Sequence, residues 1–348
     1  MESPVSARLP WFGPGKCPLY LAPMAGFTDP VFRQICKEYG ADVMVTEFVM
    51  ANKFLDPRGE VVAWETVDFS PEQRPMGVQI FGSNPEKMGQ AARKIVDRLE
   101  PDFIDINYGC PAPRVVDQCA GSSLLTDLPR LQAVAQAVVE RVTMDVPVTA
   151  KIRTGWDDDS IVAVEASRRL VDVGIEAIAV HGRTKVQGYR GAANWEVIQA
   201  VAEGVPVPVV GNGSVDSAQE VMRLREQTSV AGLMIGRAAL GYPWIFREIK
   251  ETLRTGVTPP PADIEERWQV LLRYCREMLD RPRRGEAWDH LGWMRPRLKA
   301  FTKVIPGSRQ LRQQLEKVNH YDDLVQIAEE HLANYGQEDL STVLSESH

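Results

Sequence analysis

The sequence lacks several features that would have assigned it to a familiar class. Its five cysteines are odd in number and widely spaced, and no CxxC or His/Cys pattern joins them. This excludes a disulfide framework and a thiolate–imidazole metal site. No charged segment followed by an apolar one opens the chain, and no apolar run is long enough to span a bilayer. We therefore expect a cytoplasmic protein that binds neither a metal nor a membrane.

An excess of positive charge is also lacking. The 348 residues are 44% hydrophobic and carry a formal net charge of -7. A chain of this length can bury one large core with a small appendage, or two medium cores. Because the net charge is negative, the whole molecule is no general nucleic-acid binder, and any contact with RNA must come from a local basic patch.

Short apolar runs alternate with segments of helical spacing through the first two thirds of the chain. Eight strand-like runs occur at residues 19–22, 43–46, 77–81, 103–107, 146–152, 177–181, 207–211 and 232–235. Helical spacing lies between most of them, at residues 85–99, 131–142, 161–173, 195–202 and 217–224. Eight strands that alternate with helices over about 235 residues are typical of a (β/α)8 TIM barrel.

The alternative is an open, doubly wound α/β sheet, which would want a Gly-x-Gly-x-x-Gly loop after its first strand. The sequence there is APMAGFTD, which lacks that loop. We therefore predict the TIM barrel, and with it that the chemistry lies at the C-terminal ends of the strands. The irregular residues 1–15, with their prolines and glycines, are expected to lie across the opposite end.

The last third of the chain has a different character. Residues 256–261 contain one glycine and three prolines, which predicts a linker. Helical spacing follows at residues 265–279, 288–304, 309–318 and 322–334. We expect a catalytic barrel at residues 1–255 and a C-terminal all-helical domain at residues 256–348.

A basic segment, residues 281–312, lies inside this helical region. Against two acidic residues it carries nine cations: Arg281, Arg283, Arg284, Arg295, Arg297, Lys299, Lys303, Arg309 and Arg312. Solvated helix faces would account for them as readily as a surface that binds RNA. Because the surrounding chain is acidic, the cluster is segregated, and this favours the RNA-binding interpretation.

The stretch at residues 105–125 carries the most specific chemistry. Polar and apolar residues alternate over 102–106, as in a barrel strand, and Pro111 cannot donate to a sheet ladder. We therefore expect Cys110 at the C-terminal tip of that strand. The backbone N–H groups of residues 121–123 are expected to be free for an anion or a carbonyl oxygen.

The other strand ends carry polar side chains and glycines. The whole set is Pro23, Met24, Ala25, Gly26, Glu47, Gln79, Asn107, Lys151, Arg153, His181, Arg183, Asn212, Gly213, Gly236 and Arg237. In this fold, glycines after strands seven and eight favour a phosphate site. Such a phosphate fits either a sugar-phosphate substrate or FMN.

Lys151 bears on that choice. A lysine at a strand tip is an aldolase-like Schiff-base nucleophile in some barrels. With Gln79, Asn107 and His181, however, it forms a ring of donors that suits the pyrimidine edge of an isoalloxazine better than a triose. Lys151 would then stabilise an anionic reduced flavin.

Cys110 also admits two interpretations. With His181 it resembles the thiolate–imidazole pair of a cysteine protease. A thiol with an ordinary pKa of about 8.5 is mostly protonated at neutral pH, however, and can donate a proton. That role suits a flavin enzyme in which hydride arrives on the other face of a double bond, and the residues alone leave the acceptor open.

Taken together, several motifs resemble those of the bacterial tRNA-dihydrouridine synthase family. They are LAPMAG at 21–26, DINYGCP at 105–111 with Val115 and Gly121, KIRTGW at 151–156, HGRT at 181–184, Asn212-Gly213, MIGRA at 234–238 and PWIF at 243–246. The resemblance runs from about residue 19 to residue 249. Beyond that range the helical region resembles the family's tRNA-binding domain only in position and character.

The resemblance implies an FMN enzyme that uses NADPH to reduce the C5=C6 bond of particular uridines in tRNA. Hydride would pass from flavin N5 to C6, and Cys110 would give the proton to C5. FMN would be held by Pro23, Met24, Ala25, Gln79, Lys151, His181, Asn212, Gly213, Ser214, Gly236 and Arg237. The RNA would be bound by Asn107, Arg153, Arg183, Tyr189, Arg295 and Arg297.

Ser214 departs from the family pattern, because many members carry an acidic residue after Asn-Gly. A uridine in folded tRNA must be flipped out to reach a barrel mouth, which needs a second surface to grip the RNA. The basic helices would supply it, and we expect a monomer. The rivals are an FMN barrel reductase for a free small molecule and an RNA-binding protein without catalysis.

Overall fold

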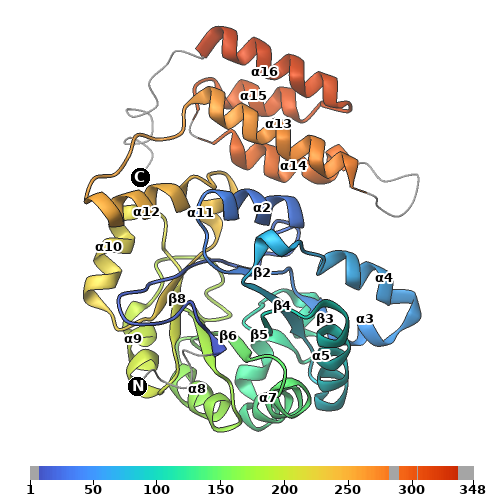
Figure 1. Ribbon diagram of the computed structural model, residues 1–348, viewed down its shortest axis with the longest axis vertical. Coiled ribbons are helices and arrows are strands. Elements are labelled where there is room, and N and C mark those ends of the chain that lie inside the picture. The colour runs from blue at the N-terminus through green and yellow to red at the C-terminus, as the bar shows by residue number, and fades with distance from the viewer. Residues whose placement is uncertain (1–7, 282–289, 304, 336–348) are drawn as a thin grey trace. The chain divides into compact units, whose positions relative to one another are not determined.

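The computed structural model describes residues 8–281, 290–303 and 305–335 (Figure 1). By their internal contacts the residues group into two compact units. One consists of Met1–Pro30 with Ala41–Gly236, and the other of Val31–Gly40 with Arg237–His348. The helix α2 (Pro30–Glu38) thus groups with the C-terminal helices. The division of the chain into functional domains at residue 256 stays a prediction.

The first unit is a parallel barrel. Its strands are β1 (Leu19–Leu21), β2 (Met44–Val45), β3 (Val49–Met50), β4 (Met76–Phe81), β5 (Phe103–Tyr108), β6 (Val148–Arg153), β7 (Ala177–His181), β8 (Val209–Asn212) and β9 (Gly232–Ile235). They are ordered β1-β9-β8-β7-β6-β5-β4-β2, and the short β3 pairs with β4 beyond β2. A parallel bridge between Tyr20 and Val43 links the two end strands. The sheet is therefore a nearly closed barrel of eight strands, which confirms the predicted fold.

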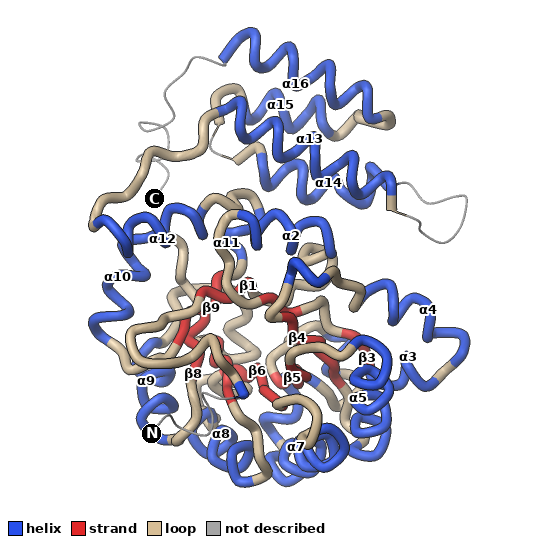
Figure 2. Tube along the Cα trace, in the orientation of Figure 1, coloured by secondary structure: helices blue, strands red, loops and turns tan. Residues whose placement is uncertain are grey.

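Helices surround this sheet (Figure 2). They are α3 (Ala51–Leu55), α4 (Pro57–Thr66), α5 (Pro85–Leu99), α6 (Pro113–Val116), α7 (Leu128–Val142), α8 (Ala163–Asp172), α9 (Trp195–Gly204) and α10 (Ala218–Gln227), with 3-10 turns at Pro71–Gln73 and Gly121–Thr126. The predicted helix at 85–99 coincides with α5. The helix expected from residue 131 begins three residues earlier, because the Asp127 side chain accepts from Arg130 N and caps the first turn of α7.

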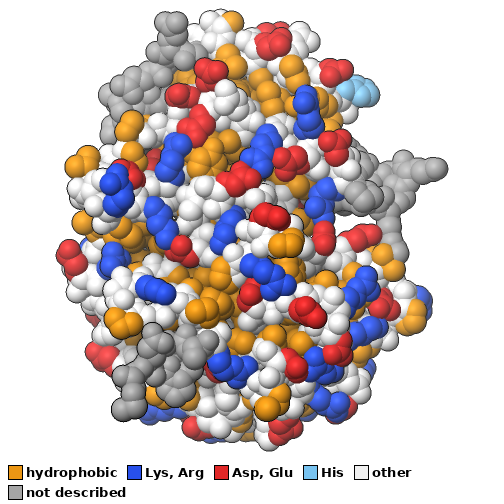
Figure 3. All heavy atoms as spheres, in the orientation of Figure 1, with side chains coloured by type: hydrophobic (Ala, Val, Ile, Leu, Met, Phe, Trp, Pro, Cys, Tyr) orange, Lys and Arg blue, Asp and Glu red, His pale blue; other side chains and the backbone are white. Residues whose placement is uncertain are grey.

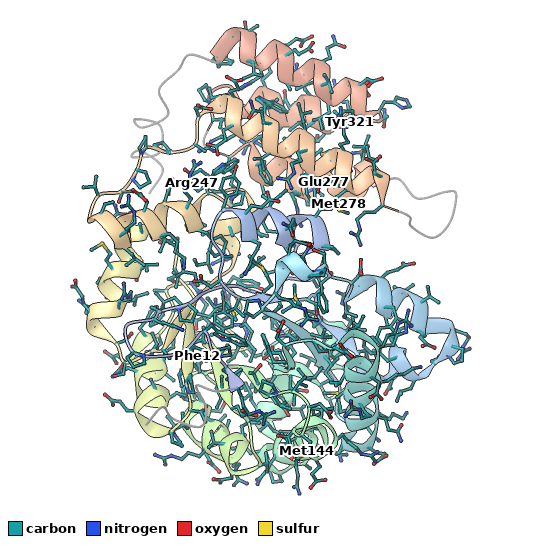
Figure 4. All side chains as sticks on the ribbon, in the orientation of Figure 1. Phe12, Met144, Arg247, Glu277, Met278 and Tyr321 are labelled. Carbon is teal, nitrogen blue, oxygen red and sulfur yellow. The ribbon has the colours of Figure 1, made fainter. Side chains whose placement is uncertain are left out.

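Two layers of apolar packing hold the barrel. The outer layer joins the strands to α5, α7 and α8, with Ile104, Ile106 and Ile152 fully buried in it. The inner layer fills the barrel with Tyr20, Phe103 and Met234, and it also contains Leu9 and Phe12 from the N-terminal lead-in (Figure 4). Leu9 and Phe12 thus pack with the barrel interior, as expected of a segment that covers one end of the fold.

The second unit is helical. It contains α2, α11 (Arg237–Leu240), α12 (Ile245–Thr255), α13 (Ile264–Asp280), α14 (His290–Phe301), α15 (Ser308–Leu315) and α16 (Tyr321–Tyr335). All four helices predicted after the linker are present, each within about two or three residues of its expected ends. The start of α16 is tied to α13, because the hydroxyl of Tyr321 donates to Leu272 O at 3.3 Å (Figure 4).

Candidate active site

The register of the strands brings the predicted polar residues to one edge of the barrel. Asn107 on β5 is paired with Lys151 on β6. Arg153 at the end of β6 is paired with His181 on β7, which is paired with Asn212 on β8. Because parallel strands end at the same side of a sheet, all five side chains start from the C-terminal mouth of the barrel, as predicted.

Asn107 shapes the loop that carries Cys110. Its side-chain Oδ1 accepts from the backbone N–H of Gly109 at 3.0 Å and of Cys110 at 2.8 Å. This amide therefore replaces the ladder partners that the chain loses when β5 ends. The Cys110 side chain packs with Phe81, Val115 and Ala120 and is 9% exposed.

The turn at residues 121–123 supports Cys110 from behind. Cys110 O accepts from Ser122 N at 3.1 Å and from Ser122 Oγ at 2.9 Å, and Ser123 N donates to Ala120 O. The prediction that these amides are free for a ligand is therefore wrong for Ser122 and Ser123, since both donate within the protein. Gly121 has φ +61, and a Cβ there would lie 2.8 Å from Cys110 O. The close approach requires glycine.

Burial raises the pKa of the Cys110 thiol, and this effect outweighs the nearby cations Arg114, Arg153 and Lys151, which lower it. The thiol is therefore protonated at neutral pH. A protonated thiol is a proton donor and a poor nucleophile, so this site is unlike the thiolate of a cysteine protease.

Lys151 has the opposite perturbation. Burial, helped by Arg153, lowers the pKa of its amine to about 8, while Asp105 and Cys110 act to raise it. The Nζ donates to Asn212 Oδ1 at 3.1 Å, and Asn212 Nδ2 donates to Met234 O at 2.7 Å. Lys151 is therefore positioned through Asn212 against strand β9 and still carries its charge at neutral pH.

Asp105 belongs to this network, although the sequence motifs gave no role to it. It is 4% exposed and accepts from Gln79 Nε2 and from Thr149 Oγ1, each at 2.6 Å. Gln79 Oε1 in turn accepts from Asn107 Nδ2 at 2.8 Å. The signal was present in the strand alternation, because Asp105 lies between Ile104 and Ile106 and must face the barrel interior when they face the helices.

Arg153 is buried and donates its hydrogen bonds to backbone carbonyls. It is 2% exposed, and its guanidinium donates to Gly109 O, Thr184 O and Gly188 O, each at 2.8 Å. Three of its five N–H groups thus join the Cys110 loop to the loop after β7. Its predicted contact with uracil stays a prediction.

His181 and Arg183 form a buried side-chain pair. Arg183 Nη1 lies 3.2 Å from His181 Nε2, and because a guanidinium only donates, that ring nitrogen accepts. Arg183 Nη2 also donates to Gly191 O at 2.6 Å and to Ser214 Oγ at 3.1 Å. The backbone around Ser214 is in the left-handed region, with φ +54 at Ser214 and φ +114 at Gly213 directly before it.

The ring of Tyr189 is the exposed part of this region. The residue is 56% exposed, with its ring centroid 6.2 Å from that of His181 and 5.6 Å from the guanidinium carbon of Arg153. At the other side of the mouth, Glu47 Oε2 accepts from Gly26 N at 3.0 Å, which holds the loop after β1. Tyr189 thus presents part of an aromatic ring to solvent at this mouth.

The small residues after β1 are partly exposed. Pro23, Met24 and Ala25 are half-buried, and Met24 N donates to Thr28 Oγ1 at 3.0 Å. Gly236 directly follows β9 in the barrel unit. Arg237 opens α11 in the second unit, so its predicted part in the cofactor site stays a prediction.

In the second unit, one of the two predicted RNA-contacting arginines is buried. Arg297 is 2% exposed, with its guanidinium carbon 4.3 Å from the ring centroid of Phe32 and 4.8 Å from that of Tyr274. This burial disfavours a direct contact with a phosphate, and the predicted RNA contact of Arg297 stays a prediction. Arg295 is half-buried and donates to Val318 O at 3.3 Å.

Charges elsewhere on this unit are mixed. Lys299 pairs with Glu316 at 2.7 Å, whereas Lys303 and Arg309 are exposed. Over the face seen in Figure 3, Lys and Arg side chains are interspersed with Asp and Glu side chains. Arg283, Arg284 and Trp288 of the basic segment lie outside the described residues.

The described part of the chain contains neither a candidate membrane span nor a candidate metal-binding group. No helix in residues 8–281, 290–303 or 305–335 combines the length and apolar character needed to cross a membrane. Among the same residues, no three His, Cys, Asp or Glu side chains are grouped so as to hold a metal ion.

The barrel fold and its polar mouth define a TIM-barrel enzyme. The sequence model of the family described as dihydrouridine synthase (Dus) matches residues 20–336. The chain belongs to this family, which confirms the resemblance and the expectation of an oxidoreductase.

Relatives agree with this assignment. The chain is 40% identical over 324 residues to tRNA-dihydrouridine synthase B of Pseudomonas aeruginosa, covering 89% of this chain and 92% of that one. It is 41% identical over 290 residues to tRNA-dihydrouridine synthase B of Shewanella oneidensis, covering 80% and 86%. It is 34% identical over 316 residues to a probable tRNA-dihydrouridine synthase of Aquifex aeolicus, covering 90% and 96%.

Among solved structures, histamine dehydrogenase from Rhizobium sp. 4-9 has a similar fold. The TM-score is 0.52 at 14% sequence identity, and the match covers 67% of this chain and 45% of that one. This likeness concerns the barrel fold alone.

Proposed function

We propose that the protein is a tRNA-dihydrouridine synthase that reduces the C5=C6 bond of particular uridines in tRNA, with FMN as cofactor and NADPH as reductant. Family membership over residues 20–336 supports the reaction class. The observation that carries the proposal is the position of Cys110, just after β5, and of Lys151, on the neighbouring β6, at one barrel mouth. Burial there raises the pKa of the thiol and lowers that of the amine to about 8. Reduction of a conjugated double bond needs both an acid and a group that stabilises negative charge.

The residues at the mouth fit a flavin. Lys151 Nζ has three donors and makes one hydrogen bond among the described residues. Gln79 Nε2 and Asn107 Nδ2 each have two N–H groups and use one of them in the network below the mouth. The pyrimidine edge of an isoalloxazine presents acceptors to such donors, and Pro23, Met24 and Ala25, which follow β1, are half-buried. The donor set therefore matches the cofactor.

FMN would be held by the residues at the ends of β1, β4, β6, β7, β8 and β9. They are Pro23, Met24, Ala25, Gln79, Lys151, His181, Asn212, Gly213, Ser214, Gly236 and Arg237. When bound, FMN supplies the hydride that adds to C6 of the uracil. Lys151 would hold its positive charge beside the flavin ring, because its pKa of about 8 keeps it protonated at neutral pH.

Cys110 would act as the acid that protonates C5. Burial keeps its proton in place until the substrate arrives, and Ser122 and Asn107 hold its backbone in one position. Asn107 is proposed to face the uracil with its second N–H, and Tyr189 to stack with a base. Arg153 and Arg183 would support these contacts by fixing the loops that carry them.

The RNA would be gripped by the helical region at residues 256–348. Since Arg297 is enclosed, we assign the RNA-facing role to Arg295 with the exposed Lys303 and Arg309. A reductase for a free small molecule would have no use for such a surface, which is why the tRNA enzyme is preferred.

Deletion of the gene, followed by mapping of dihydrouridine in total tRNA, tests the proposal. We expect one or more dihydrouridine positions to disappear and to return on complementation with the wild-type chain. Purified protein should be yellow and should oxidise NADPH. A yellow protein that oxidises NADPH, combined with unchanged dihydrouridine in the deletion strain, would favour the small-molecule reductase instead.

A further inference from the structure

A buried carboxylate lies at the foot of the predicted site. Asp105 is 4% exposed, and its two oxygens accept from Gln79 Nε2 and from Thr149 Oγ1 at 2.6 Å each. Neither the resemblance nor the family match gives this residue a role. Its hydrogen bonds run to Gln79 and Thr149, so an influence on the thiol would pass through other side chains.

Such a path is present. Gln79 and Asn107 are amides, and an isolated amide can point its oxygen or its nitrogen toward a neighbour with little difference in shape. Burial raises the pKa of the Asp105 carboxyl, but its Oδ2 is an acceptor toward Gln79 in either protonation state of the other oxygen. Gln79 therefore turns its Nε2 toward Asp105, to which it donates at 2.6 Å. Its Oε1 then faces Asn107, where it accepts from Nδ2 at 2.8 Å.

The same logic continues to the thiol loop. Since Asn107 turns its Nδ2 toward Gln79, its Oδ1 faces the backbone N–H groups of Gly109 and Cys110, from which it accepts at 3.0 and 2.8 Å. If the Gln79 amide were reversed, Asn107 would turn its NH2 group toward two N–H donors. The loop that buries Cys110 would then lose both hydrogen bonds.

We propose that Asp105 is a positioning residue that sets the donor–acceptor direction of the chain Gln79–Asn107 and thereby keeps the Cys110 thiol buried. The inference rests on the proposed function only in calling Cys110 the acid. The required feature of Asp105 is an acceptor oxygen toward Gln79, and its negative charge is secondary.

Three substitutions separate acceptor, charge and packing. Asp105→Leu has a similar shape and no acceptor. Asp105→Asn removes the charge, yet it can keep its oxygen toward Gln79 because the Thr149 hydroxyl can rotate to accept from the new NH2 group. Thr149→Val is the matched control, since it removes the other partner of Asp105 and leaves the chain to Gln79 intact.

The measurement is the rate of alkylation of Cys110 by iodoacetamide as a function of pH, followed by peptide mass spectrometry on the full-length protein, as purified and after flavin removal. Only the thiolate reacts, so the midpoint reports the thiol pKa. The exposed Cys119 in the same chain serves as internal reference. We expect Asp105→Leu to move the Cys110 midpoint to lower pH and to raise its rate at neutral pH severalfold, while Asp105→Asn and Thr149→Val match the wild type.

A wild-type profile for Asp105→Leu would overturn the proposal, and so would an equal shift in Asp105→Asn, which would assign the effect to charge. If Asp105→Leu does not fold, Gln79→Met cuts the same chain one link further on and must give the same shift. Alkylation requires neither tRNA nor NADPH. A deletion strain with unchanged dihydrouridine would therefore refute the proposed function and leave this result standing.

Discussion

The barrel mouth and the basic helices of the second unit were both predicted from sequence to carry function. The positions of the side chains were predictable at the mouth, whereas their orientation on the helices was not. At the mouth, strand ends brought Asn107, Lys151, His181 and Asn212 to one edge. On the helices, Arg297 turned inward between Phe32 and Tyr274. A strand end in a parallel barrel has one location, whereas a helical residue can face solvent or a neighbouring helix.

The largest expected effect is at the mouth. Cys110→Ala should lower the rate of dihydrouridine formation by about 10²-fold or more, because it removes the general acid. Flavin content and flavin reduction by NADPH should stay at wild-type values, as measured by absorbance under anaerobic conditions. Cys119→Ala, a neighbouring exposed thiol, is the control. Full activity in Cys110→Ala would remove the thiol from the mechanism.

On the helices, we expect a buried arginine to affect stability and exposed cations to affect tRNA binding. Arg297→Glu should lower the free energy of unfolding of the protein by about 3 kcal/mol or more, because it buries an opposite charge among aromatic rings. Lys303→Glu with Arg309→Glu should leave the melting curve unchanged and weaken tRNA binding, more strongly at low salt. Thermal unfolding and filter binding at two salt concentrations measure the two effects. A stable Arg297→Glu with weak tRNA binding would reverse the assignment.

Arg153 connects two loops of the mouth, so we expect even its replacement by lysine to lower the stability of the protein. Lysine cannot reach Gly109 O, Thr184 O and Gly188 O together, so Arg153→Lys should lower stability by about 1–3 kcal/mol. The loop at residues 184–191 should become more sensitive to limited proteolysis. Arg190→Lys is the control, since that arginine donates to one carbonyl, Val186 O. Equal proteolysis of both variants would contradict the joining role.

The smallest effect is the pH dependence of stability that Lys151 contributes. Its folded pKa is about 8, below the ordinary 10.5. Between these values the unfolded chain binds more protons, so this group makes stability rise as pH rises from about 8 to 10.5. The slope of unfolding free energy against pH should be larger in Cys110→Ser than in Cys110→Ser/Lys151→Met, because the serine removes the thiol that titrates in the same range. Equal slopes would mean that the amine is not buried in the folded state.

The sequence by itself determined the barrel and the residues at its mouth. Eight apolar runs at regular spacing require a parallel sheet covered by helices, and the residue that follows each run is then at the C-terminal edge. This logic located Cys110, Lys151, His181 and Asn212 without any knowledge of side-chain contacts. It also foresaw the helices after residue 263.

Tertiary structure alone decided what each side chain does there. Asp105 acquired its place through Gln79 and Thr149, which lie 26 and 44 residues from it in the chain. The N–H groups of Ser122 and Ser123 donate to Cys110 O and Ala120 O. Arg153 donates to the carbonyls of two loops. Hydrogen-bond partners and burial depend on distances between segments remote in sequence, and spacing along one chain carries no record of those distances.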